Sequence, residues 1–106
     1  MAKYKVEFLQ CAIDDLEEIV LYIAKDSQKC AIQLHDKIIE SATRLEEFPR
    51  LGRLLSDKKL RESGFRFIVI GKYLLFYKIY NQEINILRVL RGDRDYPYLF
   101  SNSMKS

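Results

Sequence analysis

The sequence predicts an α+β domain in which an antiparallel sheet carries an α-helical hairpin on one face. Three observations lead to this prediction. An alternating segment opens the chain, two apolar stripes with helical spacing follow, and three short apolar segments separated by turn residues come last. The element order is therefore β-α-α-β-β-β. Layer packing places both helices on one face of the sheet and leaves the opposite face open to carry function.

The first strand is expected at residues 3–9, where Tyr4, Val6 and Phe8 alternate with charged residues. Apolar residues recur about every 3.6 positions over residues 13–26, which indicates an amphipathic helix. The acidic residues at 14–18 are expected in the first turns of this helix, where the helix dipole favours negative charge.

A second helix is expected to begin after Ser27, whose hydroxyl is suited to cap it. It should end near Phe48, because Pro49 disfavours helical geometry in the residue before it. A turn then follows, and residues 56–64 are expected to form a polar link. The last three strands are expected as follows: 65–70, 73–80 and 83–90. The Gly71-Lys72 and Asn81-Gln82 pairs between them suit tight hairpins.

The size of the chain, 106 residues, predicts a single domain over residues 1–100 with a loose C-terminal tail at 101–106. No apolar run approaches the roughly 20 residues that span a bilayer, and the N-terminus lacks a secretory signal, so a cytoplasmic location without membrane contact is expected. Cys11 and Cys30 are expected to be reduced thiols packed as small apolar groups. No metal site and no cofactor are expected.

Positive charge is concentrated in the second half of the chain. Residues 1–50 hold 7 Lys/Arg against 10 Asp/Glu, whereas residues 51–106 hold 11 against 5. Candidate cationic site residues are Lys58, Lys59, Arg61, Arg66, Arg88, Arg91 and Arg94. If the strands at 65–70 and 83–90 both flank the strand at 73–80, their ends should bring these groups together. With Tyr96 and Tyr98 nearby, such a patch is suited to bind phosphates and stack bases. His35, the only histidine, is expected to be structural or at the surface.

At these residues the chain resembles the RelE/ParE superfamily of bacterial toxins from type II toxin–antitoxin modules. The matching segments span most of the chain in the family's order: Ala12-Ile13-Asp14-Asp15-Leu16-Glu17-Glu18-Ile19, Tyr22-Ile23-Ala24, Phe48-Pro49-Arg50-Leu51-Gly52-Arg53, Gly64-Phe65-Arg66, Tyr73-Leu74-Leu75-Phe76-Tyr77-Lys78-Ile79, and Ile84 through Asp95. The resemblance implies a growth-arresting toxin neutralised by a small cognate antitoxin protein. RelE-like members enter the ribosome and cut mRNA, whereas ParE-like members poison DNA gyrase and are not known as nucleases.

The resemblance also implies roles for particular residues. Arg66 resembles the arginine that RelE-like members place on the scissile phosphate, Arg91 or Arg94 the arginine after the last strand, and Tyr96 the C-terminal tyrosine. Glu62 or a lysine of lowered pKa is the candidate base. The RNA-binding candidates are Lys58, Lys59, Arg61, Arg53 and Tyr98.

Two departures weigh against a RelE-like nuclease. Many relatives have histidine where this chain has Arg91, and the long helical hairpin with its Phe-Pro-x-x-Gly turn is more ParE-like. The arginine and tyrosine set nevertheless favours ribosome-dependent mRNA cleavage narrowly over gyrase poisoning. A non-toxic RNA-binding descendant is the third alternative.

Overall fold

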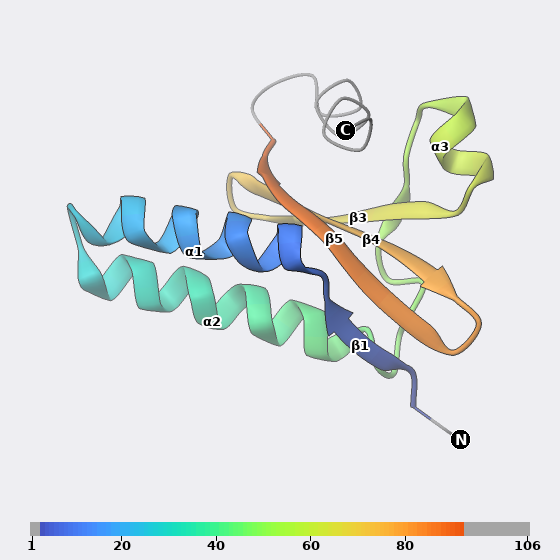
Figure 1. The fold of residues 1–106 in the computed structure, drawn as a ribbon, viewed down its shortest axis with the longest axis horizontal. Helices are drawn as coiled ribbons and strands as arrows, with labels where there is room; N and C mark the ends of the chain where they lie inside the picture. The colour runs from blue at the N-terminus through green and yellow to red at the C-terminus, as the bar shows by residue number, and fades with distance from the viewer. Residues whose placement is uncertain (1–2, 93–106) are drawn as a thin grey trace.

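The computed structural model describes residues 3–92 and contains three helices and five strands in that range (Figure 1). Their bounds are β1 Lys5–Phe8, α1 Gln10–Ala24, α2 Gln28–Arg44, β2 Arg53–Leu54, α3 Lys58–Glu62, β3 Phe65–Ile70, β4 Tyr73–Tyr80 and β5 Glu83–Arg91. The predicted α+β class is confirmed, and the last three strands lie where the sequence placed them, with β5 one residue longer.

The five strands form one sheet in the order β1-β5-β4-β3-β2. As expected, β3 and β5 both flank β4, and each runs antiparallel to it. The sheet departs from the prediction at one edge, because β1 pairs in parallel with β5, from Lys5 opposite Glu83 to Phe8 opposite Ile86. In Figure 1 this short strand lies against the first half of β5 before the chain turns into α1.

The first helix begins at Gln10, three residues before the expected start, and no acidic residue lies in its first turn. The expected dipole role of residues 14–18 is therefore wrong. Ser27 caps α2 as predicted, since its hydroxyl accepts a hydrogen bond from the Cys30 N–H at 3.1 Å. The second helix ends at Arg44, earlier than expected, and backbone turns continue the chain to Phe48.

The main core lies between the helical hairpin and one face of the sheet, here called the hairpin face. Cross-strand register places Ile68, Leu75 and Tyr77 on this face. Leu16 of α1 and Ile38 of α2 pack into the same cluster. Full burial of such side chains contributes about 1.5–3 kcal/mol each, so this layer holds the hairpin on the sheet.

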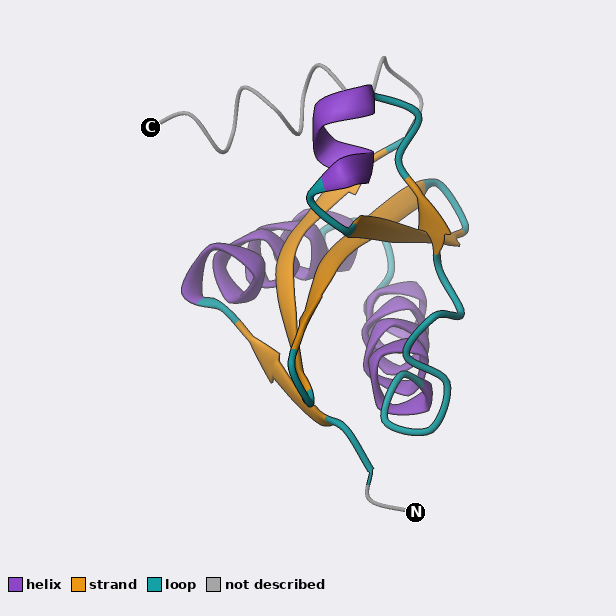
Figure 2. Cartoon of the chain, turned by 90° about the vertical axis from the view of Figure 1, so that its right-hand side faces the viewer, coloured by secondary structure: helices purple, strands orange, loops and turns teal. Residues whose placement is uncertain are grey.

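The prediction that the opposite face of the sheet is open is wrong. The segment predicted to be a polar link folds back over this face. There α3 packs through Leu60 onto a second apolar cluster, which consists of Leu55, Phe67, Leu74, Phe76 and Leu87. Figure 2 shows α3 apart from the two long helices, and α3 contacts β3. We call the face of the sheet that α3 covers the α3 face.

Both cysteines are free thiols, but neither packs as an apolar group. Cys11 and Cys30 are exposed on the long helices, which corrects the expectation of burial. Their positions near the first turns of α1 and α2 explain the exposure, since the apolar stripe of each helix lies on other residues. No helix within residues 3–92 is long and apolar enough to cross a membrane.

The turn between α2 and β2 is held by the buried phenol of Tyr77. Its hydroxyl accepts a hydrogen bond from the Gly52 N–H and donates one to the Pro49 carbonyl, both at 2.8 Å. A Cβ at position 52 would lie 2.6 Å from Tyr77 Cε1 and 2.7 Å from the Phe67 carbonyl oxygen. The glycine of the Phe-Pro-x-x-Gly turn is therefore required by close packing against Tyr77.

Replacing Tyr77 with phenylalanine should destabilise the protein by about 1–3 kcal/mol, because a buried N–H and a carbonyl lose their partners. Burial raises the pKa of Tyr77 above its ordinary value of 10.0, and the Gly52 hydrogen bond and the charge of Arg66 oppose this only in part. The folded state therefore favours the neutral phenol. This stability is fully present below pH 10 and is lost as pH rises through the raised pKa.

Urea unfolding of the wild type and the Tyr77→Phe variant at pH 8 and above pH 10 measures both effects. Tyr80→Phe is the matched control, because Tyr80 is 62% exposed. Equal stabilities of Tyr77→Phe and Tyr80→Phe would contradict the assigned role of the buried hydroxyl.

Candidate functional site

The strongest polar interaction described in the fold joins α1 to β5. Asp15 accepts hydrogen bonds from Arg88 Nε at 2.7 Å and Arg88 Nη2 at 2.8 Å. The same carboxylate accepts the Val89 backbone N–H at 3.0 Å. The hydrogen bonds that Arg88 donates to Asp15 raise the pKa of Arg88 above its ordinary value, against the opposing effect of burial. Arg88 is thus a structural cation and is not available as a phosphate ligand.

A bulge in β5 produces this contact. Tyr77 lies opposite Ile86 and Phe76 lies opposite Arg88, so Leu87 is the extra residue. Beyond the bulge β1 has ended, and α1 runs beside β5 in its place. The Val89 N–H on this edge has no strand partner there, and Asp15 satisfies it.

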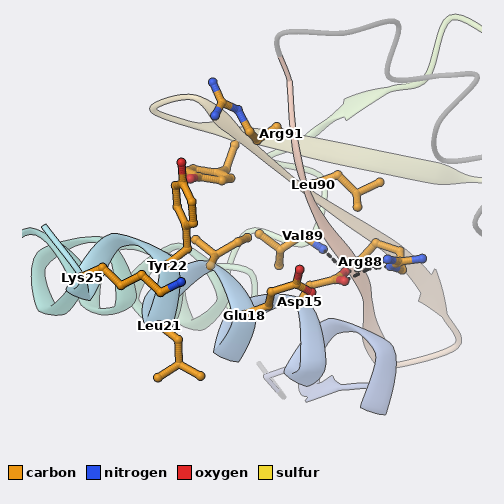
Figure 3. A pocket seen from close by; sticks show the side chains of 11 residues that line it. Asp15, Glu18, Leu21, Tyr22, Lys25, Arg88, Val89, Leu90 and Arg91 are labelled. Carbon is orange, nitrogen blue, oxygen red and sulfur yellow. Dashed lines mark hydrogen bonds and ion pairs between the residues drawn. The ribbon is translucent and has the colours of Figure 1, made fainter.

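Next to the Asp15–Arg88 pair lies a groove of ≈ 720 Å³ between α1 and the second half of β5 (Figure 3). Asp15 and Glu18 line one part of it, and Lys25 and Arg91 line another. The side chain of Tyr22 extends from α1 toward Arg91 of β5 and is 65% exposed. We call this groove, lined also by Ile19, Leu21, Tyr73, Val89 and Leu90, the α1–β5 groove.

Arg66, the residue expected to contact a scissile phosphate, is engaged within the fold. Its register partner is Tyr77, which places Arg66 on the hairpin face of the sheet. Its Nη1 donates a hydrogen bond to the Gly52 carbonyl at 2.8 Å. The guanidinium is half-buried and supports the same turn that Tyr77 holds.

The expected convergence of Arg66 with Arg91 is wrong. β3 and β5 both run antiparallel to β4, so their starts share one end of the sheet and their ends share the other. Arg66 is the second residue of β3, whereas Arg91 is the last residue of β5 and lies opposite Tyr73. Four residues along a strand and two strands across the sheet separate their Cα atoms by about 16 Å, from the usual strand spacings. The Arg66 guanidinium is also bound to the Gly52 carbonyl, next to β2 and on the side of β3 away from β5, so it is not directed toward Arg91.

The remaining predicted cations lie on the α3 face. Lys58, Lys59 and Arg61 are exposed on α3, and Glu62 is exposed at the end of this helix. Arg53 of β2 lies opposite Phe67, which places it on the same face. The sheet therefore separates these groups from Arg66. The candidate base Glu62, at the end of α3, is separated from Arg66 in the same way.

Some predicted residues are not placed by the structure. Arg94, Tyr96 and Tyr98 lie outside the described residues, and their roles remain predictions. His35 is at the surface as expected, with Nδ1 3.3 Å from the Asp36 carboxylate.

Sequence reasoning missed Asp15 and Tyr77 as residues with specific roles. Asp15 was one of several acids on a helix, and nothing local marked it as the partner of an arginine 73 positions away. Tyr77 carried a better signal, because a tyrosine inside an apolar strand needs a partner for its hydroxyl.

Comparisons with known proteins identify the family. The family model described as the ParE toxin of the parDE type II toxin–antitoxin system matches residues 6–96. A chain of the chromosomal ParDE toxin–antitoxin system from P. aeruginosa is similar in structure, with a TM-score of 0.68 at 20% identity, covering 84% of this chain and 96% of that one. A chain of the RelBE2 toxin–antitoxin complex from Mycobacterium tuberculosis is also similar, with a TM-score of 0.58 at 26% identity. The match covers 84% of this chain and 98% of that one. No curated protein sequence matches the chain significantly.

The fold and these similarities define the class: a RelE/ParE superfamily toxin of a type II toxin–antitoxin system. Within that class, the chain belongs to the ParE toxin family.

Replacing Asp15 with asparagine should destabilise the fold by about 2 kcal/mol, because Arg88 then keeps a half-buried charge without a counter-charge. The variant retains an oxygen for the Val89 N–H, so the loss reports mainly on the ion pair. Urea unfolding measures the change. Glu17→Gln, at an exposed position of the same helix, is the matched control.

A double-mutant cycle with Arg88→Met isolates the pair. The double variant should be destabilised by less than the sum of the two single variants. Additive losses would show that Asp15 and Arg88 do not stabilise each other.

Proposed function

We propose that this chain is a toxin that arrests growth by poisoning DNA gyrase, as ParE-like members do, and that it does not cleave mRNA. The observation that carries the proposal is the position of Arg66, whose guanidinium is bound to the Gly52 carbonyl on the hairpin face. Membership of the ParE family supports the same conclusion.

A ribonuclease of the RelE-like kind needs a base, an acid and cations that converge on one phosphate. Among residues 3–92 the predicted candidates for these roles are distributed over two faces and two ends of the sheet. The cations on α3 favour mRNA cleavage as the second candidate, since lysines in this segment resemble those that RelE-like members use.

Two assays with purified protein separate these mechanisms. Under the gyrase proposal, DNA supercoiling by gyrase is lost in the presence of the toxin, and mRNA from arrested cells shows no cuts at the ribosomal A site. A-site cuts together with normal supercoiling would overturn the proposal. Normal growth on expression of the folded protein would favour a non-toxic RNA-binding descendant.

Arg66→Ala sharpens the test. We expect it to lower stability by about 1 kcal/mol through loss of one hydrogen bond and to leave gyrase inhibition within a few-fold of wild type. Removal of an electrostatic donor from a nuclease site would instead lower activity about 10²–10³-fold. Arg50→Ala, at an exposed residue of the adjoining turn, makes the same change in charge and serves as the control.

We also propose that a cognate antitoxin binds the α1–β5 groove. The similar solved structures come from toxin–antitoxin systems, which supports a partner of this kind. β1 pairs with β5 only as far as Ile86, and within residues 3–92 no other strand covers that edge from Leu87 onward. Asp15 of α1 occupies the Val89 N–H, so an extended segment in the groove lies beside α1 and along the last residues of β5, Leu90 and Arg91.

The side chains of the groove indicate what such a segment carries. Tyr22 offers a large, exposed aromatic surface, and Lys25 and Arg91 supply positive charge beside it. An extended segment with an apolar side chain for Tyr22 and acidic side chains for the cationic part is complementary to this lining.

Tyr22→Ala should weaken binding of the cognate antitoxin at least tenfold, since buried tyrosines at the centre of interfaces contribute more than about 1.4 kcal/mol. Calorimetric titration of the two purified proteins measures the affinity. Ile32→Ala is the matched control, because Ile32 is 60% exposed on α2 and does not line the groove. Equal affinities of the two variants would place the antitoxin elsewhere.

A further inference from the structure

The α3 face carries a group of cations that the described core does not use. Three of them, Lys58, Lys59 and Arg61, are exposed on α3, where only Leu60 is packed against the sheet. This helix projects from the molecule away from the hairpin (Figures 1 and 2). A large ligand can therefore approach it without meeting α1 or α2.

Two further cations extend the group across the sheet. Arg53 lies opposite Phe67, and Lys78 lies opposite Phe65 on the next strand pair. Lys78 Nζ lies 5.1 Å from the centroid of the Phe65 ring, so its position above the face is held by a cation–π contact. We call Arg53, Lys58, Lys59, Arg61 and Lys78 the basic α3 surface.

The basic α3 surface has few acidic neighbours. Asp57 and Glu62 lie at the ends of α3, and the Asp57 carboxylate accepts the Leu60 N–H at 3.0 Å as the helix cap. In the described part of the chain, no ion pair joins any of the five cations to a carboxylate. By contrast, Arg88 is bound by Asp15 and Arg66 by a carbonyl.

From this arrangement we propose that the basic α3 surface binds the phosphate backbone of duplex DNA. This inference rests on the proposed action on gyrase, an enzyme that holds DNA. Lysine and arginine side chains spread over a projecting surface suit repeated phosphates and read no base sequence.

Duplex DNA fits this surface better than single-stranded RNA. Surfaces that bind single strands add aromatic side chains on which the bases stack. Here Phe67 and Phe76 are buried in the cluster beneath α3, and Phe65 is partly buried and covered by Lys78. Tyr80 is the one aromatic residue exposed on this face among residues 3–92.

The test measures binding of the purified toxin, without gyrase, to a labelled 30-base-pair DNA duplex and to a single-stranded RNA of equal length. We expect the duplex to bind more tightly. The logarithm of its affinity should fall with the logarithm of salt concentration at a slope of about −4.5, as about five phosphate contacts require.

The double variant Lys58→Gln/Lys59→Gln should bind the duplex on the order of 10- to 100-fold more weakly at 0.1 M salt, with a slope shallower by about 2. Lys29→Gln/Lys37→Gln removes the same charge from exposed positions of α2 and is the matched control, expected to bind like wild type. Circular dichroism verifies that both variants are folded.

Three outcomes would overturn the proposal: no duplex binding by wild type at 50 mM salt, equal weakening by the two double variants, or tighter binding to the RNA. A parallel supercoiling assay keeps this inference distinct from the proposed function. Gyrase inhibition without duplex binding would refute the inference alone, and duplex binding without gyrase inhibition would refute the gyrase proposal.

Discussion

The contact between Asp15 and the bulged segment of β5 governs the arrangement of this fold. One carboxylate binds the Arg88 guanidinium through two hydrogen bonds and the Val89 N–H through a third. It therefore accepts the hydrogen bond of a backbone N–H on the β5 edge, just beyond the point where β1 ends, and it fixes α1 beside that edge. A half-buried pair of this kind contributes less through net attraction than through the large cost of leaving either charge alone. The apolar core holds α1 on the sheet, and this contact adds its attachment at the β5 edge, next to the α1–β5 groove.

The turn after α2 is the second point at which distant segments are held together. Tyr77 of β4 and Arg66 of β3 both bind backbone groups of residues 49–52, and Gly52 leaves the space that the Tyr77 ring occupies. The chain needs this anchor because β2 is only two residues long and provides few sheet hydrogen bonds. Arg66 thus stabilises the turn from the hairpin face, on the other side of the sheet from α3. A residue that resembles a catalytic arginine in sequence binds a backbone carbonyl of this turn in the fold.

Two parts of the sheet differ in what they offer to other molecules. At the β5 edge, the α1–β5 groove combines an aromatic side chain, mixed charge and a strand edge, which suits a polypeptide. Beside β3, the basic α3 surface offers mainly positive charge on a projecting helix, which suits a polyanion. Because β4 lies between β5 and β3, a polypeptide in the groove does not need to compete directly with a ligand on α3.

The sequence by itself determined the fold class, the helical hairpin, the Ser27 cap and the three hairpin strands, because periodicity, capping and turn residues act over a few positions. It also located the cations of residues 53–61 that now form most of the basic surface. Only the tertiary structure decided the parallel pairing of β1, the packing of α3 and the partners of Arg66 and Arg88. Asp15 and Arg88 are 73 positions apart, and the Leu87 bulge that brings them together depends on pairing with β4. Such contacts form only after the elements have packed, so no local pattern in the chain specifies them.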